Sequence, residues 1–299
     1  MKVLITGGSG LVGMSLTRSL LSKDIEVVHL TRHKNSKAGV KTFEWDYKRK
    51  YLEQGALNGI THIVHLAGAG IADKPWTMKR KREIVKSRVQ TARLLLEKAS
   101  EQNILLQKFI SASGIGFYGA ITSEKVFNES DQRGSDFVAE CCVQWENQAK
   151  KFEDICDVAI IRTGLVLAKN EGALGKLESS VKRGLGSPIG SGNQYMPWIH
   201  IDDLTGIYEK ALIESPFKGI FNAVASQHVQ NKDFMVSLAT ALNKKIILPK
   251  IPAFMMKFIF GEMSEILLEG SRIDNKKLID SGYQFKYNYL ETTLKELYQ

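Results

Sequence analysis

Short apolar runs and amphipathic stretches alternate through the first two thirds of the chain. The apolar runs predict strands over residues 3–6, 26–31, 41–45, 62–66, 108–111 and 158–162. Helical patterns lie between several of them, the clearest over residues 79–102 and 135–152. Strands that alternate with helices predict a parallel sheet covered on both faces. We therefore expect an α/β fold with a doubly wound parallel sheet, whose strand carboxyl ends form one edge where a site would lie.

The pattern changes after residue 164. Glycines gather between residues 184 and 192, and from about residue 231 short helical segments alternate with turns. We divide the chain into a larger domain over residues 1–230 and a smaller C-terminal α/β region over residues 231–299. The segment from about residue 165 is expected to interleave with the smaller, substrate-side region.

The start of the chain carries the strongest candidate chemistry. An apolar strand runs into Gly7, Gly10 and Gly13, and a helical pattern begins at Leu11 and Val12. Glycines let the backbone approach a pyrophosphate, and a helix N-terminus offers free N–H groups and a partial positive charge. Strand, glycine turn and helix in this order are the context that the dinucleotide fingerprint requires. We predict that the larger domain is an NAD(P)-binding Rossmann domain.

The ends of two strands bear on which dinucleotide binds and where. An acidic residue after the second strand would bind the ribose 2′-hydroxyl of NAD, whereas an arginine pairs with the 2′-phosphate of NADP. This chain has Thr31 and Arg32 there, and no Asp or Glu. We predict NADP in preference to NAD; the alternative is that Arg32 is a surface cation. The fourth strand ends in Leu66, Ala67 and Gly68, whose small residues let the chain pass beside the nicotinamide ribose.

The number of cysteines and the lengths of the apolar runs indicate the compartment in which we expect the protein. Three cysteines in 299 residues form no metal or redox spacing, and an odd, low count suits a reducing cytosol. No secretory signal is evident. No apolar run reaches the ~18 residues of a membrane span, since the longest, near residues 252–260, is short and contains Lys257. We expect a cytoplasmic protein without a membrane partner.

The charge balance is basic, with 41 Lys and Arg against 32 Asp and Glu and a formal net charge of +9. Much of the excess lies in residues 74–93, which we interpret as a solvated helix face. Nucleic-acid binding would need interleaved aromatics or a known module, and neither is present. A small-molecule substrate is the expected partner, and the oligomeric state stays open.

The Gly-x-x-Gly-x-x-Gly spacing, preceded by Thr6, resembles the extended short-chain dehydrogenase/reductase superfamily. In that superfamily a Tyr four residues before a Lys is the acid/base, and a Ser at the end of the fifth strand orients the carbonyl. The Lys ammonium and the cofactor's charge lower the Tyr pKa from its usual value of about 10. Residues 110–119 resemble the strand-five segment and place Ser113 and Tyr118 at the edge of the site.

The Tyr-Lys pair itself is missing, because none of the nine tyrosines has Lys four positions later. If Glu146 takes the place of the glutamate that usually ends the motif, Val138 and Cys142 occupy the Tyr and Lys positions. A valine cannot transfer a proton. The standard reductase mechanism is therefore absent, or its proton donor has moved, and Ser113 and Tyr118 are the candidate catalytic residues.

Three replacements for the pair stay open: a moved tyrosine donor, a carboxylate base and a cysteine nucleophile. They rest on Tyr118 tuned by Arg88 or Lys81, on Glu83 or Glu146, and on Cys142. The structural alternatives are that Tyr118 packs beside the strand end and that Cys142 is a small helix hydrophobe.

Together these residues resemble a narrower group, the epimerase-family subgroup of atypical short-chain dehydrogenases, also described as cell-division-inhibitor-like. The most specific marks are residues 184–192 and 197–203, and the end of the chain resembles that group's small domain of unknown function. The resemblance covers nearly the whole length and makes the lost Tyr-Lys pair a family trait. It implies NADP contacts at Thr31, Arg32, Leu66, Ala67, Glu83, Arg88 and Glu146. One departure is Asn275, where the family commonly has proline.

His200 and Asp203 are close enough in sequence to suggest a catalytic dyad. We interpret residues 198–201 as a short strand that feeds a helix capped by Asp202 or Asp203, so that both residues have capping and core roles. The remaining histidines show no ligand spacing, and we propose no metal.

Two functions remain open from the sequence. One is an NADP(H)-dependent oxidoreductase or epimerase acting on a small carbonyl, hydroxyl or nucleotide-sugar-like substrate, with the glycines of residues 184–192 lining the pocket. The other is a regulatory protein that senses NADP(H) without turnover. A third, weaker interpretation is nucleic-acid binding through the basic surface.

Overall fold

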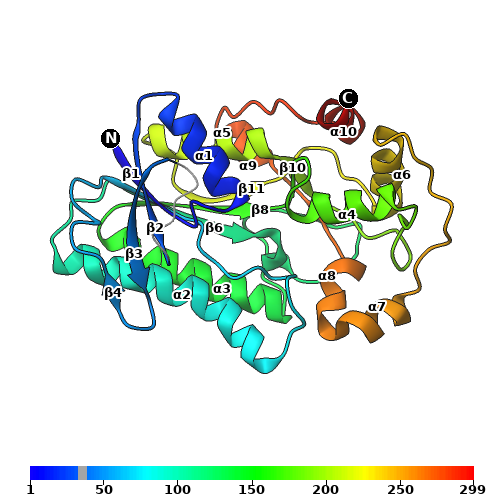
Figure 1. The fold of residues 1–299 in the computed structure, drawn as a ribbon, viewed down its shortest axis with the longest axis horizontal. Helices are drawn as coiled ribbons and strands as arrows, with labels where there is room; N and C mark the ends of the chain where they lie inside the picture. Colours follow the sequence, from blue (N-terminus) through cyan, green and yellow to red (C-terminus); the bar gives the residue numbers. More distant parts are fainter. Residues whose placement is uncertain (33–38) are drawn as a thin grey trace.

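The computed structural model of the protein describes residues 1–32 and 39–299. Its centre is an eight-stranded sheet in the order β11-β8-β6-β5-β1-β2-β3-β4 (Figure 1). The strands are β1 (Lys2–Thr6), β2 (Glu26–Thr31), β3 (Lys41–Asp46), β4 (Tyr51–Leu52), β5 (His62–His65), β6 (Lys108–Gly114), β8 (Asp157–Thr163) and β11 (Gly219–Ala223). All neighbours pair in parallel except β3 with β4. The doubly wound parallel sheet is therefore confirmed.

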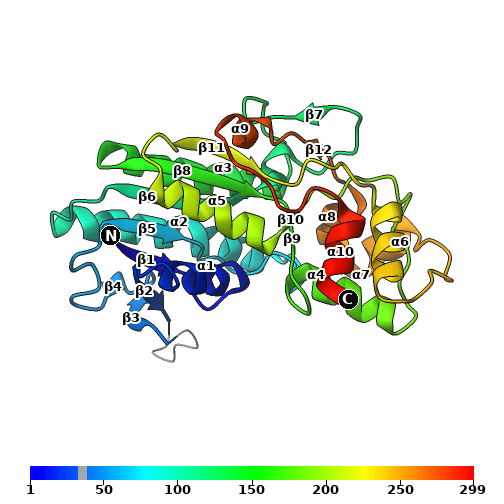
Figure 2. The same cartoon turned by 90° about the horizontal axis from the view of Figure 1, so that it is seen from above.

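Alternating side chains of the strands face two helical layers. Val3 and Ile5 join one core cluster and Leu4 joins the other, because successive strand residues point to opposite faces. Figure 2 shows one pair of helices in front of the sheet and a second pair behind it. The pairs are α1 (Leu11–Leu21) with α5 (Ile201–Ile213), and α2 (Met78–Glu101) with α3 (Phe137–Lys150). A sheet buried on both faces needs nearly continuous apolar strands, which this sequence supplies.

The strand order reverses beside β1. The chain runs from β1 out to β4 on one side and then returns to β5 on the other. In the register of these strands, Thr6 is level with Leu30 of β2 and with His65 of β5. A crevice at the carboxyl ends of β1 and β5 is where open α/β sheets bind their ligands.

A smaller region lies beside the sheet, on the right of Figure 1. Its elements are β9 (Leu165–Leu167), α4 (Gly172–Lys182), β10 (Trp198–His200), α6 (Asn231–Ala241), α7 (Ala253–Phe260), α8 (Glu265–Leu268) and α10 (Leu290–Tyr298). One apolar cluster joins Leu167 and Trp198 to Phe234, Leu238 and Leu294. Segments from before and after residue 225 therefore share a core, while the domain boundary at residue 230 stays a prediction.

Three-residue or shorter strands account for most of what the pattern did not predict. β7 (Val126–Phe127) pairs with β12 (Arg272–Ile273), just before α9 (Lys276–Asp280), and β9 pairs with β10. Of these strands, β10 was expected, because residues 198–201 were interpreted as a short strand that leads into a helix. The expected helices form within two residues of their predicted ends, each with a side-chain N-cap, Thr77 for α2 and Asp136 for α3. Within the described residues, no helix combines the length and the apolar character needed to cross a membrane.

Candidate functional site

The turn between β1 and α1 is held tight by two glycines. Gly7 has a φ of +70°, and a Cβ at this position would lie 2.9 Å from the carbonyl carbon and oxygen of Leu66. A Cβ at Gly13 would lie 2.5 Å from the Gly7 carbonyl oxygen. Glycine at position 7 therefore lets the ends of β1 and β5 meet, and glycine at position 13 lets α1 pack onto the turn.

The N-terminus of α1 is open to an anion. Its N-cap is Gly10, no side chain of the described residues caps it, and its first turn carries no acidic residue. The first intrahelical bond runs from the Met14 N–H to the Gly10 carbonyl. The earlier N–H groups, those of Leu11, Val12 and Gly13, have no intrahelical acceptor by the geometry of a helix. These amides and the helix dipole make a site for a phosphate group.

A buried histidine, His29, packs against this turn. This role was not predicted from the sequence. The His29 ring of β2 fills the space beside Gly8, where a Cβ would lie 2.5 Å from it. The Thr17 hydroxyl donates to the Gly13 carbonyl at 2.7 Å and also contacts His29 Nε2 at 2.7 Å. Since that hydroxyl has one proton, His29 donates from Nε2. Burial lowers the pKa of His29 to about 4, so the ring is neutral.

The end of β5 forms the second wall of the crevice. The Thr6 hydroxyl oxygen accepts hydrogen bonds from the N–H groups of Leu66 and Ala67, both at 3.2 Å. Gly68 follows, and a Cβ there would meet the Arg88 guanidinium at 3.0 Å. The structure thus brings Gly7, Leu66 and Ala67 together and places Arg88 directly against Gly68.

Arg88 is fixed by its surroundings rather than by a carboxylate. It donates to the carbonyls of Ala69 and Ile84, both at 3.0 Å, and lies over the Trp145 ring at 5.0 Å from its centroid. Burial is the main cause that lowers the pKa of Arg88. Next to Trp145 lies His65, whose pKa burial lowers to about 3. The charge that lies against the end of β5 among the described residues is therefore the Arg88 cation.

The residues at the end of β2 lie at the surface, at the rim of the crevice between β1 and β5. Thr31 is half-buried and Arg32 is exposed. His33 and Lys34 lie outside the described residues. Glu83 is also exposed, and its partner is Arg80 at 2.9 Å, a hydrogen bond that lowers the pKa of Glu83. In its contacts Glu83 therefore stands apart from Gly7, Leu66, Ala67 and Arg88, which the structure brings together.

A fully buried ion pair lies under the carboxyl ends of the central strands. Arg162 of β8 and Glu146 of α3 meet in a bidentate arrangement, with N–O distances of 2.8 and 2.9 Å. Their side chains are each 2% exposed. The Ser113 hydroxyl donates to Glu146 Oε1 at 2.7 Å. Although burial opposes it, hydrogen bonding to Glu146 raises the pKa of Arg162.

Strand register brings this network together. Ser113 of β6 pairs with Arg162 of β8, and Arg162 pairs with Asn222 of β11. Residues in register on parallel strands share a face, so the three side chains form one row. Tyr118, in the 3-10 turn Ile115–Tyr118, closes the row by donating to Asn222 Oδ1 at 2.7 Å and accepting from Arg162 at 3.0 Å.

Tyr118 is buried, and its tuning partner is Arg162. The alternatives named from the sequence were wrong, because Arg88 packs on Trp145 and Lys81 pairs with Glu262. Burial raises the pKa of Tyr118 to about 12, against the opposing effect of Arg162. The phenol is therefore protonated at neutral pH, and it is a hydrogen-bond donor rather than a phenolate base.

Val138 and Cys142, which would take the Tyr and Lys positions if Glu146 ends the motif, are packing residues. Val138 packs against Gly116, where a Cβ would lie 2.5 Å from it. Cys142 is buried in α3, and burial raises the pKa of its thiol to about 12. A covered, protonated thiol does not act as a nucleophile, so the geometry favours the helix-hydrophobe interpretation.

His200 and Asp203 do not form a dyad. His200 is the N-cap of α5, accepting from the Asp202 N–H at 3.2 Å, so the expected cap by Asp202 or Asp203 was wrong. The Asp203 carboxylate accepts the backbone N–H groups of Lys286 and Tyr287 at 2.9 and 3.0 Å. It ties the C-terminal segment to α5, which is the core role expected for it. No group of three His, Cys, Asp or Glu among the described residues is arranged to hold a metal.

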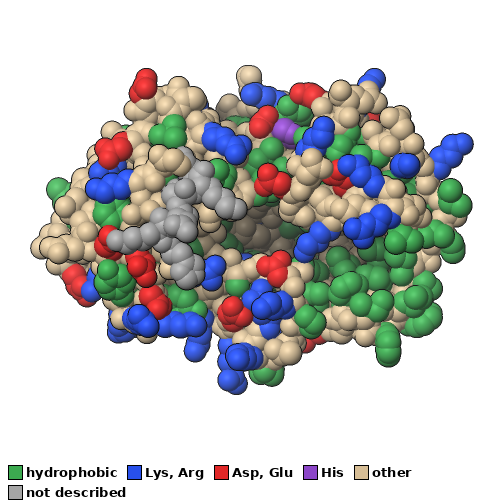
Figure 3. Space-filling model, in the orientation of Figure 1, with side chains coloured by type: hydrophobic (Ala, Val, Ile, Leu, Met, Phe, Trp, Pro, Cys, Tyr) green, Lys and Arg blue, Asp and Glu red, His purple; other side chains and the backbone are tan. Residues whose placement is uncertain are grey.

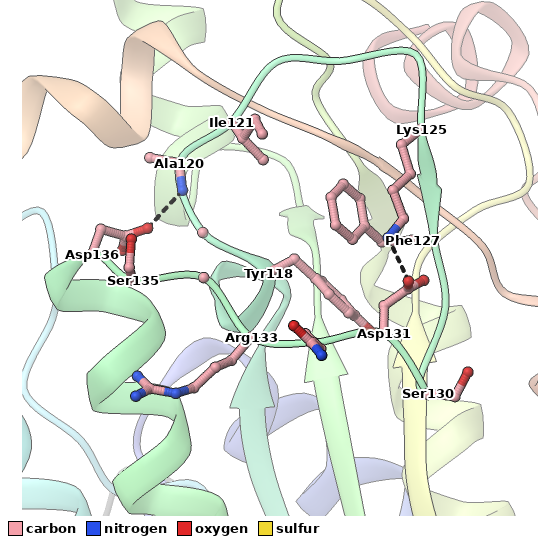
Figure 4. Close-up of a pocket in the computed structure, with 13 residues that line it drawn as sticks. Tyr118, Ala120, Ile121, Lys125, Phe127, Ser130, Asp131, Arg133, Ser135 and Asp136 are labelled. Atoms are coloured by element: carbon pink, nitrogen blue, oxygen red, sulfur yellow. Dashed lines mark hydrogen bonds and ion pairs between the residues drawn. The ribbon is translucent and has the colours of Figure 1, made fainter.

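Two openings lie near the candidate catalytic residues Ser113 and Tyr118. Figure 3 shows a hollow at the centre of the viewed face, over the carboxyl ends of the central strands. A separate pocket of about 650 Å³ is lined by Tyr118 and residues of the segment 119–136 (Figure 4). Across it, Ala120 donates to Asp136, and Lys125 pairs with Asp131. Tyr118 thus stands between the buried row and this pocket, whose lining includes none of the glycine turn.

Comparison with known proteins gives consistent matches over the whole chain. Residues 3–223 match the NAD dependent epimerase/dehydratase family, and residues 251–297 match a domain of unknown function (DUF1731). The human epimerase family protein SDR39U1 is 31% identical over 300 residues, covering 99% of each chain.

Two solved structures are also similar. The crystal structure of human SDR39U1 (isoform 2) with NADPH has a TM-score of 0.88 at 29% identity, covering 99% of each chain. The nucleoside-diphosphate sugar epimerase from Corynebacterium glutamicum has a TM-score of 0.80 at 31% identity, covering all of this chain and 58% of that one.

We predict that removing one partner of the buried ion pair strongly destabilises the fold. Glu146→Met or Arg162→Met alone should lower the free energy of unfolding by ~3–5 kcal/mol, because each leaves an unpaired buried charge. The double variant should lose less than the sum. Urea unfolding measures all three.

Arg133→Met is the matched control, because the exposed Arg133–Glu140 pair has a similar separation of 2.7 Å. Its loss should cost at most about 1 kcal/mol. If the single variants of the buried pair lose as little free energy of unfolding as this control, the prediction of an unpaired buried charge is wrong.

Proposed function

Since the chain belongs to the NAD dependent epimerase/dehydratase family, we propose that it binds NADP(H) in the crevice between β1 and β5. The observation that carries the proposal is the uncapped N-terminus of α1 behind the glycine turn. The pyrophosphate rests on the amides of Leu11, Val12 and Gly13. A side chain at Gly7 or Gly13 would collide with backbone, so the residues present fit such a group.

The preference for NADP(H) over NAD(H) rests on the rim of β2. Thr31 and Arg32 offer a hydroxyl and a cation where the adenine ribose would extend from the pyrophosphate. An arginine recognises a 2′-phosphate through charge-assisted hydrogen bonds. The NADPH bound in the similar human structure supports this choice.

The reaction we propose is hydride transfer with a small carbonyl, hydroxyl or nucleotide-sugar-like substrate, as an oxidoreductase or an epimerase. NADP(H) supplies the hydride donor or acceptor when bound. Ser113 and Tyr118 are the candidate catalytic residues, since both lie at the carboxyl end of β6. The sugar-nucleotide class is supported by the similar Corynebacterium structure, which is a nucleoside-diphosphate sugar epimerase.

The hydrogen bonds define what these two residues can do. The Ser113 proton is committed to Glu146, so the Ser113 oxygen accepts a hydrogen bond from a substrate hydroxyl. Tyr118 keeps its proton at neutral pH and donates it as an acid or a hydrogen bond, giving up Asn222 when it does so. Arg162 and Glu146 position both groups without touching the substrate.

A second candidate function is NADP(H) sensing without turnover. The observation that favours it is the pair Val138 and Cys142, which carry no available proton at the positions where reductases have Tyr and Lys. A protein of this kind would bind the dinucleotide in the same crevice and respond to it by conformation alone.

We predict that Arg32→Ala weakens NADPH binding by ~1.5–3 kcal/mol, the range for a hydrogen bond to a charged group, and leaves NADH binding nearly unchanged. Calorimetric titration with both dinucleotides measures the difference. Arg93→Ala, an exposed arginine paired with Glu97 on α2, serves as the control. Equal losses for NADPH and NADH would remove the argument for NADP(H).

We predict that Tyr118→Phe lowers kcat/KM about a hundredfold, the lower end for a lost proton-transfer group. Ser113→Ala should lower it about tenfold, because it removes one hydrogen bond to the substrate. The assay follows deuteride transfer from labelled NADPH to a panel of aldehydes and ketones, and epimerisation of nucleotide sugars in the presence of NADP+, which would accept the hydride and return it. Ser111→Ala, on the same strand, and Tyr208→Phe, another buried tyrosine, are the matched controls.

The outcomes separate the two functions. Turnover that survives both changes would overturn the assignment of Ser113 and Tyr118. Tight NADPH binding with no turnover on any substrate would favour the sensor.

A further inference from the structure

The smaller region presents an apolar surface that the proposed site does not use. Of the eight residues of α7, only Met256 is buried. Phe254, Met255, Phe258 and Ile259 are all exposed, Phe258 by 91%. Residues four apart lie on one side of a helix, so Phe254 with Phe258 and Met255 with Ile259 form one outward stripe.

Neighbouring loops extend this stripe. Ile247 is 84% exposed, and Leu248 and Leu185 are exposed beside it in the same region. Figure 3 shows the resulting hydrophobic area at the lower right, where Figure 1 places α7. We call these seven residues, 185, 247, 248, 254, 255, 258 and 259, the α7 face. Contiguous exposed apolar areas on a protein surface mark interaction sites.

Basic residues dominate the segment that carries most of the α7 face, and the acidic residues Asp233 and Glu262 flank it on either side. Residues 234–261 contain four lysines and no Asp or Glu. Lys244, Lys245, Lys250 and Lys257 are all exposed, and Lys250 donates to the Ser191 carbonyl at 2.6 Å. The other three form no ion pair with any described residue. Figure 3 shows Lys and Arg side chains along the upper border of the apolar area.

We propose that the α7 face docks the protein on a membrane surface rich in anionic lipid. Exposed Phe, Met and Ile side chains enter the boundary between headgroups and acyl chains, and the lysines beside them attract anionic headgroups. A second copy of the chain fits less well, because a symmetric contact would bring the lysine clusters together. The earlier expectation of no membrane partner considered spanning segments only, and a helix of eight residues lies on a membrane without crossing it.

The test is co-sedimentation of the full chain with two kinds of vesicle. One contains phosphatidylcholine alone and the other an equimolar mixture with phosphatidylglycerol. Wild-type protein should sediment with the mixed vesicles and stay in solution with phosphatidylcholine. Lys245→Gln with Lys257→Gln should weaken binding about thirtyfold, from the contribution of each basic residue near an anionic surface. Phe254→Ser with Phe258→Ser should weaken it at least about tenfold.

Matched controls use residues elsewhere on the surface. Leu105→Ser removes an apolar side chain that is 88% exposed, and Lys79→Gln removes an exposed lysine of α2. Both should bind like wild type, and near-ultraviolet circular dichroism should show every variant folded.

Three results would overturn the proposal: wild-type protein that stays in solution with the mixed vesicles, equal binding to both vesicle types, or full binding by the Phe254/Phe258 variant. Sedimentation velocity adds a fourth. A wild-type dimer that the same variant converts to monomer would show that a second copy covers the face.

Discussion

The close approach of two strand ends is the constraint on which the candidate site depends. Gly7 lies against the Leu66 carbonyl because it has no side chain, and Thr6 holds the following amides with one hydroxyl oxygen. With β1 and β5 fixed in this way, Gly13 lets α1 descend onto the turn and aim its free N–H groups at the crevice. His29 fills the space under Gly8 as a neutral ring.

A second constraint is the buried polar network that holds the two candidate catalytic residues. In-register positions on β6, β8 and β11 carry Ser113, Arg162 and Asn222, and Glu146 neutralises the charge that this row buries. The ion pair is costly to desolvate, and its hydrogen bonds to Ser113 and Tyr118 offset that cost while fixing both hydroxyl groups. The network orients both hydroxyl groups, and its phenol, Tyr118, keeps its proton at neutral pH and is a hydrogen-bond donor.

The sequence predicted the sheet, its main helices and the glycine turn because periodicity and local spacing encode them. It did not predict β11, where the buried polar Asn222 interrupts a short apolar run, nor the paired dipeptides of β7 and β12. The Arg162–Glu146 contact joins a strand to a helix, and only tertiary packing shows it. The same holds for His29 under Gly8 and for the His200 cap. Local chemistry favoured Asp202 or Asp203 as caps, but Asp203 is instead bound to the C-terminal segment.

Dinucleotide binding at the α1 N-terminus is the central claim, and isothermal titration calorimetry at two temperatures tests it most directly. Folded wild-type protein should bind NADPH with one site per chain and more tightly than NADH. Gly10→Val, which places a branched side chain over the turn, should abolish that heat while leaving the thermal unfolding temperature within a few degrees of wild type, of the order expected for a surface substitution. No heat from either dinucleotide at both temperatures, with the protein folded, would contradict the account.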